Sequence, residues 1–446
     1  MSKTLNMTQG NPLKLLIRFS LPLMFGNVFQ QLYTVVDTAI VGKGVGMAAL
    51  AALGGVDWLN WMMLGIAQGF TQGFSVRISQ KFGENDMDGL RRFMGQSAVL
   101  SALLAILCVL LGQLALPLFL RFLRIPTELS GMAQLYTRIL FAGLPAVFFF
   151  NYCSAMLRAV GDSKTPLVAM AVASVINIAL DIVAVFVLDW GIAGAAVATL
   201  IAQGLSGVIC LIKILRTPML RFRKQDLTLH KNTLGNLIQI GSPSAAKNMI
   251  IALGGMAVMA VVNTFGTAFI AGFTSTNKLY GLLEICALSY GYAVITYVGQ
   301  NYGAMRFDRI KAGMKSATIL AVVTAVIISA LMFLFGRPIT MLFISTENPA
   351  DALQAGNVAY YYLCVMAAWL PVLYILYLLL SALQGLGDTV RPMISGMIEL
   401  VARVSIAILV AYIGYESGIF FAEIIAWTGA VVYLWYHYRK RIKQGI

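Results

Sequence analysis

Twelve apolar runs, each about 20 residues or longer, follow one another along this chain and restrict what it can fold into. A helix of about 20 apolar residues crosses the hydrocarbon core of a bilayer, whereas a barrel strand would alternate over about 10 residues. Only 11% of the residues are charged and the mean hydropathy is +0.82, which a water-soluble core cannot accommodate. We therefore predict an all-α integral membrane protein. The predicted spans are 13–41, 56–76, 93–116, 135–157, 166–188, 192–215, 234–262, 268–298, 312–335, 358–383, 392–412 and 418–438.

The chain contains an internal repeat. Residues 157–181 (LRAVGDSKTPLVAMAVASVINIALD) and 383–407 (LQGLGDTVRPMISGMIELVARVSIA) share Leu, Gly-Asp and Pro at one constant offset of 226. Shorter stretches, such as 80–83 and 300–303, align at an offset of 220. Each copy has an apolar run, a Gly-Asp turn and a Pro that can open the next helix. The chain is therefore a duplication.

The longest polar connection divides the two copies. It covers residues 216–233 and separates two six-span bundles, residues 1–215 and 234–446. Because each bundle has an even number of spans, the two have the same membrane orientation and form parallel repeats. We expect them to surround a central cavity, because repeats of this kind commonly support alternating access in transporters.

Lysine and arginine residues predict the orientation. Most of the 32 lie in the N-terminal segment, at the C-terminus and in connections after even-numbered spans, so both termini and the 216–233 linker should face the cytoplasm. A net charge of +14 could also suit nucleic acid, but basic loops beside anionic lipid explain it without another partner. We therefore expect the lipid bilayer, and no nucleic acid, as the partner of these charges.

Four of the polar residues inside the predicted spans of the first half are candidates for a functional site, because polar groups within a membrane are costly. They are Asp37, Asn177, Asp181 and Thr199. Asn177 and Asp181 are four residues apart and share a helix face. The set could hold a shared proton, since two buried carboxylates disfavour simultaneous ionisation, or Na⁺ in an all-oxygen shell. Alternatively, each aspartate could be a helix-end residue bonded to backbone or water.

The repeat argues against that structural alternative. At the offset of 226, Asp181 corresponds to the apolar Ala407. Near the offset of 220, Asp37 corresponds to Ala257 or Val258, which are also apolar. A purely structural requirement would be expected in both copies.

The second half has its own intramembrane charges. Glu399 and Arg403 are four residues apart and should neutralise each other. Lys278 and Glu284 do not share a helix face, and either could line a substrate cavity, where Glu284 could attract a cationic substrate; a structural pairing is an equal alternative. Glu423 lies near a predicted span end, where capping or snorkelling explains it.

The order of several motifs resembles the multidrug and toxic compound extrusion (MATE) family over essentially the whole chain. The motifs are LPLMFGNVFQQLYTVVDTAIVG, which ends just after Asp37, then RAVGDSKTP, GIAGAAVAT and VGQNYGA. The resemblance implies export of bulky, amphipathic, often cationic compounds against inward movement of H⁺ or Na⁺. In prokaryotic members the cation site lies in the N-terminal half, and here it falls on Asp37, Asn177, Asp181 and Thr199. These would be metal ligands only if Na⁺ is the coupling ion.

The resulting prediction is a secondary antiporter of the bacterial cytoplasmic membrane, acting by alternating access as a monomer. It should need no cofactor, and it has no nucleotide-binding motif for ATP. A lipid-linked saccharide flippase of similar architecture is the main alternative, but it would need a strongly cationic cavity. A membrane-embedded enzyme would need a nucleophile, a base or a metal cluster, and the only histidines, His230 and His437, lie outside the spans or at their edges.

Overall fold

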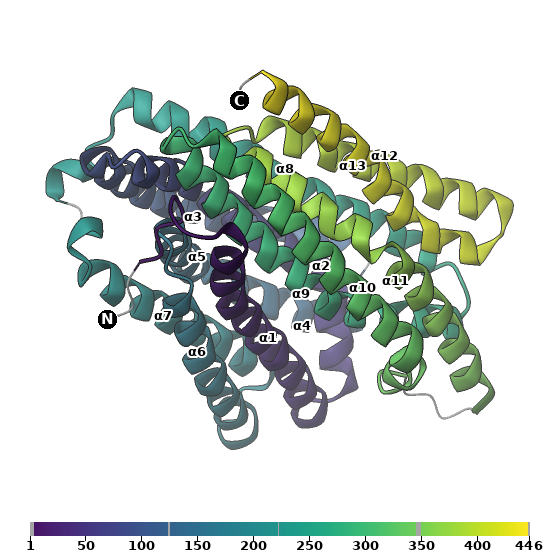
Figure 1. Cartoon of the computed structure of the whole chain (residues 1–446). Helices are drawn as coiled ribbons and strands as arrows, with labels where there is room; N and C mark the ends of the chain where they lie inside the picture. Colours follow the sequence, from purple (N-terminus) through teal and green to yellow (C-terminus); the bar gives the residue numbers. More distant parts are fainter. Residues whose placement is uncertain (1–3, 124, 222, 345–348, 445–446) are drawn as a thin grey trace. The chain divides into compact units, whose positions relative to one another are not determined.

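The computed structural model describes residues 4–123, 125–221, 223–344 and 349–444, and these residues are almost entirely helical, with no strand (Figure 1). The predicted all-α fold is therefore confirmed. The long helices are α1 (Pro12–Gly44), α2 (Met47–Gly83), α3 (Met87–Phe122), α4 (Thr127–Ala142), α5 (Leu144–Ala159), α6 (Lys164–Ile182), α7 (Gly191–Leu215), α8 (Lys231–Val262), α9 (Thr267–Gly303), α10 (Phe307–Met341), α11 (Pro349–Gly385), α12 (Val390–Ile413) and α13 (Phe421–Lys443). Four short helical segments connect them: the π-helical turn η1 (Val183–Val187), and the 3-10 turns η2 (Pro218–Leu220), η3 (Lys224–Leu227) and η4 (Glu416–Phe420).

Eleven of the described helices are long and apolar enough to cross a membrane, and a bent pair makes a twelfth span. The bent pair is α4 and α5, which meet at 45° where the sequence predicts one continuous span. Gly143 ends α4, and Pro145 occupies the first turn of α5. Proline lacks an N–H and clashes with a preceding helical turn, so it starts a new helix here.

Two compact units make up the described chain. Unit 1 holds residues 4–9, 17–249 and 299–305, and unit 2 holds residues 10–16, 250–298 and 306–444. Helices α1, α8 and α9 contribute residues to both units. These units are defined by which residues pack together and do not coincide with the two copies of the repeat. The division into two bundles, 1–215 and 234–446, joined by the linker 216–233 therefore stays a prediction.

The core of unit 1 surrounds α5. Met156, Leu157 and Cys153 on this helix are almost fully buried, and Met94 of α3 and Cys210 of α7 pack in the same core. Helix α5 thus lies between α2, α3 and α7.

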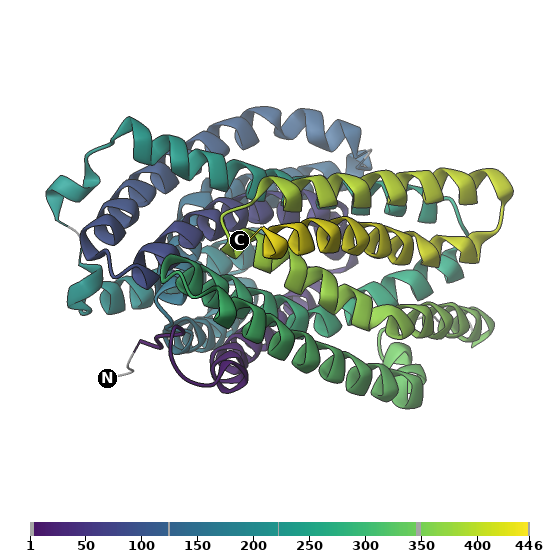
Figure 2. The same ribbon diagram turned by 45° about the horizontal axis from the view of Figure 1, so that its top comes forward.

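Unit 2 has two closely packed helix pairs, α10 with α11 and α12 with α13 (Figure 2). An aromatic stack lies between α9, α11 and η4. The ring of Tyr362 lies 4.7 Å from that of Phe273 and 4.8 Å from that of Phe420, measured between centroids, and all three rings are nearly parallel. Stacked rings of this kind add stabilisation beyond their buried area.

The duplication recurs in backbone detail. Helices α3 and α10 begin at Met87 and Phe307, which are 220 residues apart. The residue two places before each start, Asn85 or Met305, has a left-handed backbone with φ of 59° or 56°. Left-handed non-glycine residues are uncommon, so their recurrence at the repeat offset is strong support for a common ancestral unit.

Three glycines at four-residue spacing let α2 approach α8 closely within unit 1. A Cβ on Gly69 would lie 2.4 Å from the Cα of Ala245, and one on Gly73 would lie 2.7 Å from the Cα of Gly241. One turn earlier, Asn248 donates its amide N–H to the carbonyl of Gly65 at 2.8 Å. This is the small-residue packing that brings helices together in lipid, where burial of apolar side chains supplies no driving force.

We expect Gly69→Ala to destabilise the protein by about 1–3 kcal/mol, because the new methyl group meets backbone that cannot move aside. Thermal unfolding in detergent micelles measures the effect. Gly204→Ala in α7 is the matched control, since a Cβ there has open space. Equal melting temperatures for the two variants would contradict close packing at Gly69.

Candidate functional site

Three helices of unit 1 carry the four residues singled out from the sequence. Asp37 lies on α1, Asn177 and Asp181 lie on α6, and Thr199 lies on α7. These helices pack closely near the site. A Cβ on Gly44 of α1 would lie 2.4 Å from a methyl group of Val185, just after α6. Near the middle of α6, the Ser174 hydroxyl donates a hydrogen bond to the carbonyl of Phe29 at 3.4 Å.

The site residues are buried. Asn177 and Asp181 are fully buried, Asp37 is 9% exposed, and Thr199 is half-buried. The carboxylates of Asp37 and Asp181 are near enough for their charges to repel each other. Neither carboxylate forms an ion pair with any residue that the structure describes. Unit 1 therefore brings two buried carboxyl groups within range of each other, with no counter-charge from the described residues.

Several polar atoms of this site have no hydrogen-bond partner among the described residues. They are one carboxylate oxygen of Asp37, both carboxylate oxygens of Asp181, and the amide oxygen and nitrogen of Asn177. Buried polar groups without partners cost about 1–3 kcal/mol each, and more when charged. Such a group of unsatisfied oxygens fits a ligand that brings positive charge, either a proton or a small hard cation.

Sequence reasoning missed three neighbours of the site. Tyr33 and Tyr136 both lie within electrostatic range of Asp37 and Asp181, and Gln203 donates its amide N–H to the Tyr33 hydroxyl at 3.5 Å. Helical spacing would have found two of them, since Tyr33 precedes Asp37 by four residues and Gln203 follows Thr199 by four. Tyr136, on α4, has no such signal.

The backbone changes its hydrogen-bond pattern just after Asp181. Helix α6 continues into the π-helical turn η1, in which Leu188 donates to the carbonyl of Val183 at 2.9 Å. The structure packs Ala184 of this turn against Gly194 of α7, where a Cβ would lie 2.8 Å from the Ala184 side chain. Single π-turns inside helices are frequently found at functional sites.

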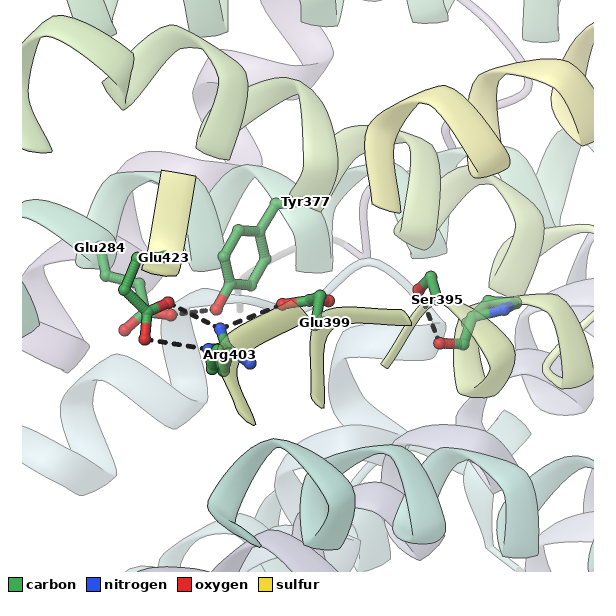
Figure 3. Close-up of polar contacts among 7 residues, drawn as sticks. Glu284, Tyr377, Ser395, Glu399, Arg403 and Glu423 are labelled. Carbon is green, nitrogen blue, oxygen red and sulfur yellow. Dashed lines mark hydrogen bonds and ion pairs between the residues drawn. The ribbon is translucent and has the colours of Figure 1, made fainter. Parts of the chain in front are cut away.

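Unit 2 contains a different group of charges, which we term the glutamate cluster: Glu284, Glu399, Glu423 and Arg403 (Figure 3). The predicted pair is confirmed, since Arg403 donates to Glu399 at 3.2 Å. Arg403 also donates two bonds to Glu423, at 2.9 Å and 2.7 Å. The prediction that capping or snorkelling explains Glu423 is therefore wrong, because α12 and α13 pack side by side and bring Glu423 to Arg403.

The other two predicted residues of the second half differ in their surroundings. Glu284 on α9 is half-buried and accepts a hydrogen bond from the Tyr377 hydroxyl of α11 (Figure 3). Lys278, also on α9, is exposed. Three glutamates and one arginine give the glutamate cluster a formal excess of negative charge.

The two hydrogen bonds from Arg403 to Glu423 predict which variants of the glutamate cluster lose most stability. Glu423→Gln should destabilise unit 2 by about 1.5–3 kcal/mol, because it removes the charge from a two-bond contact with Arg403. Glu399→Gln should cost less, because the bond between Glu399 and Arg403 is single and, at 3.2 Å, longer. Thermal unfolding of the purified protein measures both.

Glu416→Gln is the control, since this exposed glutamate lies outside the glutamate cluster. A larger loss of stability for Glu399→Gln than for Glu423→Gln would show that the single bond, rather than the bidentate one, carries the greater stabilisation.

The duplicated helical architecture and the charges inside its spans define the chain as a multi-pass membrane transporter. The family model MatE matches two segments, residues 22–183 and 243–412, one in each copy of the repeat. The chain belongs to this family, the MATE transporters, whose members are transporters and not enzymes.

Individual relatives cover nearly the whole chain. A probable multidrug resistance protein, YpnP of Bacillus subtilis, is 28% identical over 441 residues, 98% of each chain. An FAD transporter of Shewanella oneidensis is 25% identical over 91% of this chain and 89% of its own. Among solved structures, a MOP superfamily transporter from Pyrococcus furiosus superposes with a TM-score of 0.92 at 24% identity, covering 100% of this chain and 99% of that one. The last similarity shows the shared fold.

Proposed function

We propose that this chain is a secondary antiporter that exports amphipathic, often cationic compounds in exchange for H⁺ or Na⁺. The observation that carries the proposal is the pair Asp37 and Asp181, two buried carboxylates without a counter-charge among the described residues of unit 1. A transporter driven by a cation gradient needs a group that gains and loses a cation inside the membrane. The carboxylate pair has the charge for that task, and its repulsion is relieved when a cation binds.

Either coupling ion fits the residues of this site. A proton could be shared between Asp37 and Asp181. Sodium, as a transported substrate, could take oxygen ligands from these two, from the amide of Asn177 and from the hydroxyl of Thr199. Either ion would reduce the repulsion between the carboxylates of Asp37 and Asp181 and so favour a closer approach of α1 and α6.

Transport follows from differential binding. If the cation binds one conformation more tightly than the other, its arrival shifts the population toward that conformation, and its release reverses the shift. If the exported compound prefers the opposite conformation, the two ligands exchange across the membrane. The coupling free energy cannot exceed the difference in affinity of each ligand for the two conformations.

The glutamate cluster supports a cationic substrate. Glu284 is half-buried within it, and the formal charge of the cluster is negative. The relative named as a multidrug resistance protein agrees with such a substrate class, whereas the relative named as an FAD transporter would carry an anionic dinucleotide. A lipid-linked diphosphate, the substrate of the flippase alternative, is disfavoured by the same glutamates.

The membrane setting is part of the proposal. We place the chain in the cytoplasmic membrane of a bacterium with both termini in the cytoplasm, because the basic connections cluster on that side. We expect a single chain to suffice, because all four cation-site residues come from unit 1 of one polypeptide.

Dye efflux from proteoliposomes tests the antiport. With purified wild-type protein, an imposed proton or sodium gradient should drive efflux of a fluorescent cationic dye. Asp37→Asn and Asp181→Asn should each reduce gradient-driven efflux at least tenfold, because removal of one charge abolishes the paired site. Comparison of the two gradients identifies the coupling ion.

Asp88→Asn is the matched control, since it removes a carboxylate from unit 1 whose side chain is 87% exposed. Efflux by this variant should equal that of wild type. Undiminished efflux by both Asp37→Asn and Asp181→Asn would remove the carboxylate pair from the mechanism. Dye that moves under neither gradient, together with FAD that does move, would favour an anionic substrate.

A further inference from the structure

A groove in unit 2 runs between the first turns of α10 and the last turns of α13, with α11 as its floor. Its volume is about 540 Å³. Four basic residues line it, Lys311 and Lys315 of α10 and Arg439 and Lys443 of α13, and the floor is apolar, with Leu378 and Leu379 of α11. The groove is thus cationic at its rim and apolar at its floor.

The four cations lack local acidic partners. None forms an ion pair with a residue in the described part of the chain. Two nearby arginines behave differently, since Arg391 and Arg441 both pair with Asp388. The basic residues of the groove are therefore available to an anionic ligand from outside the chain.

One wall has the features of a membrane interface. Trp435 is 46% exposed, and the guanidinium carbon of Arg439 lies 3.9 Å from the centroid of its ring. Tryptophan is enriched where a membrane meets water, and lysine and arginine extend their charged ends to the same level. The stack with Trp435 also holds the Arg439 charge over the groove.

The repeat provides an internal comparison. In unit 1 the equivalent surface lies between α3 and α7, over α5. There the linker itself covers the surface, because Met219 and Leu220 pack into the core around α5, and Leu220 is fully buried. The linker also lies directly on Gly95, where a Cβ would be 2.3 Å from the carbonyl oxygen of Asp226.

The residues at corresponding positions explain the difference. At the offset of 220, Lys311 corresponds to Arg91, and Lys315 corresponds to Gly95. The lysine thus replaces a glycine whose lack of a side chain admits the linker in unit 1. The same surface that accepts apolar linker side chains in unit 1 is an open groove in unit 2, with the half-buried Ile375 of α11 on its floor and an additional charge at its rim.

We propose that this groove binds an anionic phospholipid. Its phosphate would lie among Lys315, Arg439 and their basic neighbours, and its acyl chain would lie along the α11 floor, where unit 1 has Met219 and Leu220. Basic pockets between helices at the cytoplasmic side of a membrane bind anionic lipid headgroups in this way. The assignment to the cytoplasmic leaflet rests on the orientation proposed above, whereas binding itself does not.

Native mass spectrometry of the purified full-length protein tests the site. Wild type should retain phosphatidylglycerol and cardiolipin at least tenfold more tightly than phosphatidylcholine. The double variant Lys315→Gln, Arg439→Gln should bind the anionic lipids about thirtyfold more weakly, because it removes two of the four cations. The melting temperature of the lipid-free variant should equal that of wild type, since both side chains are exposed.

The control double variant is Arg216→Gln, Lys231→Gln, which changes the net charge equally at exposed residues near the ends of the linker. It should bind anionic lipid within twofold of wild type.

Equal binding of anionic lipid by wild type and by the double variant Lys315→Gln, Arg439→Gln would overturn the proposal. Equal retention of phosphatidylcholine and of anionic lipid by wild type would also overturn it. Protection against heat by inorganic phosphate as strong as that by phosphatidylglycerol would assign the groove to a free anion instead. The assay involves no transport, so its outcome is independent of the antiport test.

Discussion

The cost of placing a charge in an apolar surrounding governs how both units are built. In unit 2 this cost is offset, since Arg403 bonds Glu399 on its own helix and Glu423 on the neighbouring α13, and Tyr377 bonds a third glutamate, Glu284. In unit 1 it is not, because Asp37 and Asp181 lie close together with oxygens that no described residue satisfies. A buried carboxylate pair of this kind is costly unless it gains a proton or a cation, and intramembrane carboxylates are therefore candidates for function. The two copies of one ancestral unit have diverged, one toward a bonded network of charges and the other toward a carboxylate pair, which in our proposal takes an exchangeable cation.

Close helix packing limits how far the helices of unit 1 can shift relative to one another. Gly69 and Gly73 bring two backbones together where any side chain would collide, and Gly44 leaves room for the side chain of Val185. In lipid such contacts replace the burial of apolar surface as the source of helix association. They also make the packing sensitive to small displacements, because a close contact cannot be deformed gradually. A change of charge at Asp37 or Asp181 can then be transmitted to the helices that carry them.

Much of the site could be predicted from the sequence, because its signals are local. Asn177 and Asp181 share a helix face by spacing alone, and the repeat shows that the carboxylate belongs to one copy. The pairing of Glu399 with Arg403 has the same origin, as both lie on one helix. Glu423 was misassigned because its partner is 20 residues away on another helix, and spacing within a helix says nothing about which helices pack together. The bend at Gly143 was missed for a similar reason, since continuous apolar composition does not reveal a change of helix direction.

The sequence by itself determined the helical membrane class, the duplication and the identity of the costly polar residues. Each of these depends on composition and on short-range periodicity, which the chain carries whatever its tertiary arrangement. Only the tertiary structure decided that Tyr136 lies beside the carboxylate pair, that Glu423 completes the glutamate cluster, and that the linker covers one copy of a surface and leaves the other as a basic groove. Those outcomes depend on which helix faces meet, and that choice comes from the packing of side chains far apart in the sequence.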